Sequence, residues 1–338
     1  MKKYILLLAL SLLLNGCVSA YRPYFAAPAP LEEKDRINAE KMAQILGIKH
    51  ETTLLLDRDE LSFALQHREY FAESVKLLGF SAVAIPFASP EEADIENEIG
   101  REMYELISYL ETESVKCVYI LRESFFINRS QGSRFIWRGG NPYKDTLLKL
   151  KEFWHELPRR AEMPTVMIAL EMNHWNDRNA DRPAGLLFTW RSEKKNKGDS
   201  NDRMFTTSMQ FFEQCREILD LQELILVADE EVILAGEKGW LTNGNAAQLL
   251  DKCDALGMIA DRKENKISVA GRLQFMKLLE VNGAVFIILP ADMKSADDYG
   301  SWLEILKIWY SEADKFESNA GIWIQNWKKL NKIWRNAQ

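Results

Sequence analysis

Short apolar runs alternate with amphipathic segments along most of this 338-residue chain. The runs are continuous instead of alternating apolar with polar, which is typical of parallel strands that are buried on both faces. Their length of four to seven residues also suits strands better than helices. The pattern therefore predicts eight strands, at residues 52–56, 81–87, 116–121, 165–170, 224–228, 255–260, 284–289 and 321–324.

The segments around these runs predict helices, because apolar residues recur in them near the helical period. After the first strand we expect one helix that Asp59 caps and Gly79 ends. After the second strand, Ser89 followed by Pro90 and two acids predicts another helix start. The remaining helices are expected at residues 32–47, 143–157, 206–219, 246–253, 268–282 and 299–316.

Strands that alternate with helices indicate an α/β fold with a parallel sheet. A doubly wound open sheet gives the same local pattern, but its usual Gly-rich turn after the first strand is replaced here by Asp57-Arg58-Asp59-Glu60. Eight units also fit the usual size of a closed barrel. We therefore expect residues 32–338 to form a single (β/α)8 TIM-type barrel domain.

Six of the eight apolar runs are followed closely by an acid. In a (β/α)8 barrel the strand ends line one mouth, where the chemistry is done. Arginines stand next to three of these acids, but neighbouring strand residues point to opposite faces, so their ion pairs would have to cross between strands. The candidate catalytic acids are Glu171, which we rank first, then Asp229, Asp261 and Asp292, with Asp57 and Glu123.

Two long connections, residues 124–141 and 172–205, follow the third and fourth strands and carry many aromatic residues. Loops of this length tend to be functional. Aromatic rings above a ring of acids suit a carbohydrate site, although the rings could equally pack the loops onto the barrel. The candidate substrate-binding residues are Trp137, Trp175, Trp190, Asn173 and Trp327.

The chain begins with Lys2 and Lys3, an apolar stretch over residues 4–14, and then Asn15-Gly16-Cys17. This order is typical of a secretory signal. The apolar stretch itself is too short for a permanent membrane span. Its end resembles the bacterial lipobox, which implies cleavage before Cys17, lipidation of Cys17 and attachment to a membrane. We therefore expect a signal peptide at 1–16, a flexible linker at 17–31, and an exported lipoprotein of the cell envelope, at the outer membrane, cell surface or periplasmic face. An ordinary signal peptide is the alternative.

Net charge and the spacing of Cys and His limit the classes of binding partner and cofactor to be expected. A net charge of −7 argues against nucleic acid as the main partner, because nucleic acid favours a basic surface. Cys117, Cys215 and Cys253 are far apart in the chain and are expected to be buried free thiols. No spacing of Cys and His predicts a metal site, so we expect no cofactor and no metal ion; a divalent cation held by the mouth carboxylates is the alternative.

The layout broadly resembles the (β/α)8-barrel glycoside hydrolases. Glu171 ends the fourth strand, Asn173 follows it, and Asp292 follows the seventh strand. The pattern differs from the large clan with acids on those strands, because Leu170 precedes Glu171 and an Asp stands where Glu is usual. The resemblance implies a glycosidase-like hydrolase that uses paired carboxylates on a glycan substrate. The alternative is a non-catalytic envelope lipoprotein that binds glycan or a protein partner.

Overall fold

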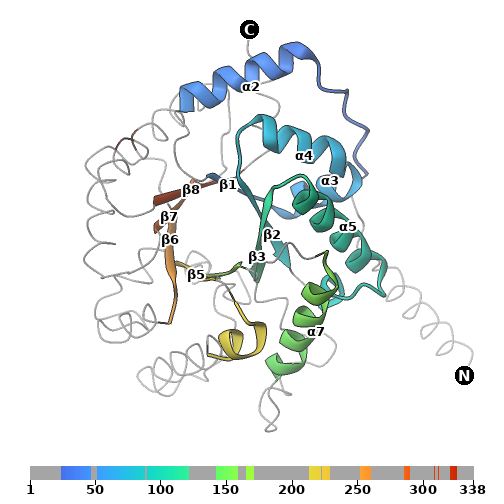
Figure 1. Cartoon of the computed structure of the whole chain (residues 1–338), viewed down its shortest axis with the longest axis vertical. Helices are drawn as coiled ribbons and strands as arrows, with labels where there is room; N and C mark the ends of the chain where they lie inside the picture. The colour runs from blue at the N-terminus through green and yellow to red at the C-terminus, as the bar shows by residue number, and fades with distance from the viewer. Residues whose placement is uncertain are drawn as a thin grey trace, which may run out of the picture.

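A computed structural model of the chain describes residues 24–46, 52–87, 90–121, 142–158, 165–170, 213–221, 223–228, 252–259, 285–289, 308, 311 and 320–325. Eight strands form one closed barrel in chain order, as Figure 1 shows. The strands are β1 (Thr52–Leu55), β2 (Ala82–Phe87), β3 (Lys116–Leu121), β4 (Thr165–Leu170), β5 (Glu223–Ala228), β6 (Ala255–Ile259), β7 (Val285–Leu289) and β8 (Ala320–Gln325).

Every pair of neighbouring strands is parallel, and β8 pairs with β1 to close the barrel. The predicted (β/α)8 barrel is therefore confirmed, and the open sheet is excluded by the pairing of Thr53 with Trp323. The predicted bounds of β3 and β4 are the observed ones, and the other strands differ by a residue at one end or both.

The helices of the described part lie outside the strands (Figure 1). α5 (Glu98–Thr112) shows why, since Met103, Leu106, Ile107 and Leu110 recur at the helical period and are all buried. Residues 213–219 are also helical. The other elements are α2 (Glu33–Leu46), α3 (Arg58–Gln66), α4 (Arg68–Leu77), the 3₁₀ turn η1 (Pro90–Ala93), α5 (Glu98–Thr112) and α7 (Pro142–Glu156).

Two expected helices are divided in the structure. The helix after β1 breaks at His67, whose φ of −134° and ψ of 48° leave the helical region, so that α3 and α4 replace one long helix. Gly79 does follow the end of α4, with a φ of 78° that suits glycine. After β2, the predicted helix start at Pro90 forms only η1, and α5 begins separately after Asn97.

Aromatic side chains fill the layer between the barrel and α7. Phe87 of β2 contacts Tyr119 of β3 and Phe153 of α7, with ring centroids 5.9 and 5.8 Å apart. Tyr119 also contacts Trp154 at 5.0 Å. All four side chains are buried. Because aromatic pairs add to the free energy gained by burial, this layer fixes β2 and β3 against their helices.

Candidate active site

Asp57 is the predicted catalytic acid that the structure describes, and it caps α3. Its Oδ1 accepts a hydrogen bond of 2.7 Å from the backbone N–H of Glu60, and the backbone N–H of Asp57 donates to Glu60 Oε2 at 3.1 Å. This reciprocal pair is a capping box. The prediction that Asp59 caps this helix was wrong, because the box makes Arg58 the first helical residue and places Asp59 inside the first turn.

Arg58, which follows Asp57, pairs with an acid from the neighbouring connection. Its Nη2 lies 2.6 Å from Oε1 of Glu92, which belongs to η1 after β2. The Glu92 side chain is 2% exposed and the Arg58 side chain 47%. Arg58 thus pairs across to the next connection, but with Glu92 and not with one of the six acids that follow the strands. The pair therefore ties together the connections that follow β1 and β2 at the mouth.

Sequence reasoning missed Glu92 because Glu91 and Glu92 look alike after Pro90, and both were interpreted as acids at a helix start. The signal that could have found Glu92 is weak: an acid shortly after β2, opposite an arginine shortly after β1. Side-chain burial distinguishes the two acids, since Glu91 is exposed and Glu92 is buried.

η1 is held close to α5 by a glycine. A Cβ on Gly100 would lie 1.9 Å from the carbonyl oxygen of Asp94, which is far inside van der Waals contact. The same carbonyl accepts a hydrogen bond from the N–H of Asn97. Gly100 therefore allows the turn that carries Glu92 to pack directly on the first turn of α5.

The other predicted site residues lie outside the described residues. The structure does describe the strands that precede five of the acids, and these strands end at Leu121, Leu170, Ala228, Ile259 and Leu289. Because the strands are parallel and adjacent, their carboxyl ends meet at one end of the barrel. The predicted site residues that lie outside the described residues are Glu123, Glu171, Asp229, Asp261 and Asp292, with Trp137, Asn173, Trp175, Trp190, Trp327 and Cys17.

Burial removes several titratable groups from acid–base chemistry. Burial is the main cause that raises the pKa of the Tyr119 hydroxyl well above its usual value. It likewise raises the pKa of the Cys117 and Cys215 thiols, and that of Cys253 to about 12. All three cysteines are free, as predicted, and the predicted burial holds for Cys117 and Cys215, whereas Cys253 is half-buried. These thiols stay protonated near neutral pH and are therefore poor nucleophiles.

The described ranges contain neither a metal-binding cluster nor a membrane-spanning helix. There, no group of three or more His, Cys, Asp or Glu side chains is placed to hold a metal ion. Nor is any helix of that part long and apolar enough to cross a bilayer.

No protein-family model and no curated protein sequence matches the chain. Solved structures do match. One is a psychrophilic glycoside hydrolase family 10 endo-β-1,4-xylanase, with a TM-score of 0.51 and 10% identity over 84% of this chain and 89% of that one. Another is a thermostable mutant of the xylanase Xyn10A from Cellvibrio japonicus, with a TM-score of 0.50 and 10% identity over 84% and 88%. At such identity the likeness shows the fold: a TIM barrel of the kind found in glycoside hydrolases.

Proposed function

We propose that this protein is a membrane-anchored, glycosidase-like hydrolase of the bacterial cell envelope, acting on a glycan through paired carboxylates at the carboxyl-terminal mouth of its barrel. The observation that carries the proposal is the closed parallel barrel, which gathers at one end the strand termini that six acids follow in the sequence. The fold shared with two xylanases supports it, since barrels of this shape hold glycan-cleaving sites in those proteins.

Glycoside hydrolysis needs one carboxyl group that delivers a proton to the leaving oxygen and a second that is ionised. The second attacks the sugar directly when the two groups are about 5 Å apart, and activates a water when they are farther apart. Glu171 is our first candidate because it follows β4 directly in the chain. Its partner comes from Asp229, Asp261, Asp292 or Glu123.

The described part of the mouth narrows this choice. Asp57 already accepts a backbone hydrogen bond in the capping box, and this role accounts for its position without catalysis. Glu92 is buried against Arg58 and is held as a scaffold acid. We therefore assign both residues to fixing the connections after β1 and β2, and leave bond cleavage to the acids after β3 to β7.

Glycan binding is assigned to aromatic rings, which stack on the flat faces of sugars. The residues proposed for this role are those of the two long connections and the chain end: Trp137, Trp175, Trp190 and Trp327, with Asn173 as a hydrogen-bonding partner. The lipid anchor is assigned to Cys17. Two or three acyl chains would hold the protein firmly, because each buried CH₂ contributes about 0.8 kcal/mol.

The decisive experiment screens the mature protein against plant and bacterial envelope glycans and repeats the productive assay with isosteric variants. Glu171→Gln and one of Asp229→Asn, Asp261→Asn, Asp292→Asn or Glu123→Gln should each lower kcat by about 10²–10⁴-fold, because a general acid or base contributes that much. Circular dichroism and glycan binding should stay unchanged. Asp59→Asn, an exposed residue in the first turn of α3, is the matched control.

Two results would change the conclusion. If the wild-type protein binds glycan but none is cleaved, the alternative of a non-catalytic binding lipoprotein replaces the hydrolase. If cleavage occurs and no variant of the five acids alters it, the carboxylate site has been placed on the wrong residues.

A further inference from the structure

The segment before α2 is fastened to the side of the barrel by Phe25. Its backbone N–H donates a hydrogen bond of 3.0 Å to Oε1 of Gln66, and its carbonyl oxygen lies 3.0 Å from Nε2 of His67. Its ring packs edge-on against Phe63, with centroids 5.7 Å apart. Both backbone groups and the side chain of Phe25 are therefore engaged at the junction of α3 and α4.

This contact lies where the helix after β1 is divided. His67 stands at the break, where its imidazole reaches the Phe25 carbonyl and its ring lies 4.9 Å from Phe63. A straight helix would carry this side chain to a different position, since each residue turns the helix by a fixed angle. The α3–α4 junction is therefore the contact surface on which Phe25 docks.

Docking at Phe25 shortens the predicted linker. The sequence alone indicated a free segment up to residue 31, but only residues 18–24 separate Cys17 from Phe25. Fully extended, that stretch reaches at most about 28 Å. From the docking point, the nine-residue helix α3 leads back about 13 Å to its capped end at the mouth. With Cys17 in a membrane, the Asp57 edge of the mouth would therefore stay within about 41 Å of the lipid surface.

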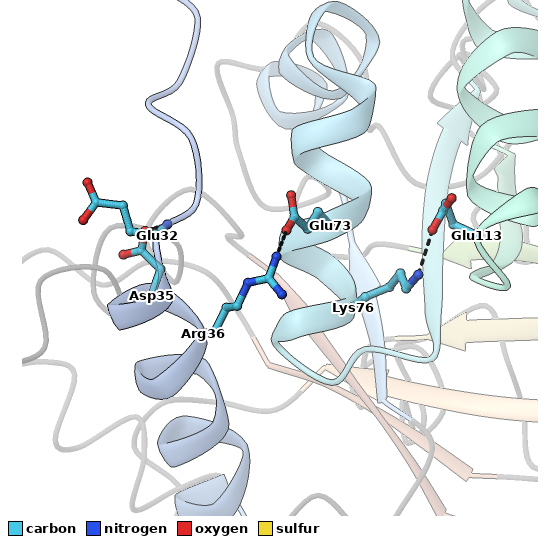
Figure 2. Close-up of polar contacts among 6 residues, drawn as sticks. All are labelled: Glu32, Asp35, Arg36, Glu73, Lys76 and Glu113. Atoms are coloured by element: carbon cyan, nitrogen blue, oxygen red, sulfur yellow. Dashed lines mark hydrogen bonds and ion pairs between the residues drawn. The ribbon is translucent and has the colours of Figure 1, made fainter.

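Among the described side chains of this flank, the charges do not form a basic cluster that would bind lipid. Attraction to anionic lipid needs clustered basic residues, whereas cations here stand beside acids in and around the groove between α2, α4 and α5 (Figure 2). The pairs are Arg36–Glu73 at 3.0 Å, Lys76–Glu113 at 2.7 Å and Arg68–Glu105. Closeness to the membrane would therefore come from the length of the tether and not from charge.

We propose that the chain from Cys17 to Phe25 is a short tether that ends where Phe25 docks at the α3–α4 junction. This tether holds the flank toward the anchoring membrane and restricts the enzyme to glycan near the lipid surface. The inference rests on the lipid anchor and the hydrolase of the proposed function, and it names the substrate class: saccharide chains attached to that membrane or lying within about 41 Å of it.

The test measures distance and not turnover. Mature protein whose lipid on Cys17 has been verified by mass spectrometry is placed in vesicles of neutral phosphatidylcholine that contain an acceptor-labelled lipid. A donor dye is attached at Glu69→Cys, an exposed position on α4 close to the junction. Cys117 and Cys215 are buried and should react slowly with the dye, and the raised pKa of the half-buried Cys253 should slow its reaction as well.

The double variant Phe25→Ala with Gln66→Ala should release the segment as far as α2, so that about twice as many residues are free. The mean distance from anchor to flank should then grow about 1.5-fold, because it follows the square root of the free length. Adding seven Gly/Ser residues after Tyr21 should have nearly the same effect without altering any contact of the folded body. Ser62→Ala is the matched control, since its hydroxyl bonds Arg58 within α3 and does not contact Phe25.

Energy transfer in the wild-type protein should be the same in anionic vesicles and at high salt. The tether proposal is overturned if neither the Phe25→Ala, Gln66→Ala variant nor the Gly/Ser insertion lowers energy transfer. It is also overturned if anionic lipid raises energy transfer strongly, or if Cys17 carries no lipid. None of these results depends on hydrolysis, so they are distinct from failure of the catalytic proposal. If both proposals hold, the released variant should cleave a soluble oligosaccharide as before and vesicle-borne glycan less selectively.

Discussion

Ion pairs at the mouth and on the α2–α4–α5 flank join the same kinds of group in different surroundings. Glu92 at the mouth has a 2% exposed side chain, whereas Glu73 and Glu113 on the flank are 46% and 35% exposed. A buried carboxylate depends on its partner, because water cannot solvate it if the partner is lost. An exposed carboxylate is solvated in either case, and its ion pair contributes little.

This difference separates an acid that holds two connections together from acids on an exposed flank. At the mouth, Glu92 and Asp57 are fixed by Arg58 and by the first turn of α3, and they hold two connections in place. On the flank, Arg36 and Lys76 each stand beside a partly exposed acid. The role of an acid in this protein is therefore indicated by its burial and its partners, and not by how many acids follow the strands.

The largest expected effect is at Gly100, which lets η1 pack on α5. Gly100→Ala should lower the free energy of unfolding by about 3 kcal/mol, because overpacking against fixed backbone is costly and the Asp94 carbonyl would have to move. Urea denaturation measures this loss. Gly79→Ala is the comparison: its φ of 78° is strained for alanine, which costs about 1 kcal/mol. Equal losses in the two variants would show that η1 shifts freely.

The Arg58–Glu92 pair should respond unequally to loss of either partner. Arg58→Met leaves a buried carboxylate without this cation and should cost about 2 kcal/mol, below the range for fully buried pairs because Arg58 is half exposed. Glu92→Gln keeps the shape and leaves Arg58 in water, so it should cost less than half as much. Urea denaturation at neutral pH measures both. A larger loss for Glu92→Gln would contradict the assignment of the buried partner.

Asp57 offers a test that separates capping from catalysis. Asp57→Ala should cost about 1 kcal/mol of stability, whereas Asp57→Asn should cost much less, because asparagine is also a good N-cap. Asp59→Ala, inside the first turn, should be close to neutral. Thermal denaturation checks the order of the three variants. If Asp57→Asn kept its stability but lost hydrolysis, Asp57 would belong to the catalytic set after all.

The strands could be predicted from the sequence because a buried parallel strand leaves a local signal, a continuous apolar run. β3 and β4 were predicted to the residue for this reason. The capping of α3 by Asp57 and not by Asp59 could not be predicted, because both acids precede the same helix and only the reciprocal bonds with Glu60 decide between them.

Contacts between distant parts of the chain were also beyond the sequence. At the helix break, His67 contacts Phe25, which lies 42 residues earlier. Likewise, the structural role of Glu92 depends on its ion pair with Arg58, which lies in another connection. Six acids after strands mark the mouth of a barrel, but which of them are engaged in structure is a matter of three-dimensional neighbours.

The smallest expected effect is on the flank. Lys76→Met removes the cation 2.7 Å from Glu113 and should change the free energy of unfolding by about 0.5 kcal/mol or less, because both side chains are partly exposed. Urea denaturation at low and high sodium chloride measures it, and the small loss should vanish at high salt through screening. The loss in Arg58→Met should persist, since salt does not reach a buried carboxylate. If Lys76→Met cost as much as Arg58→Met at both salt concentrations, burial of the acid would not decide what these pairs contribute.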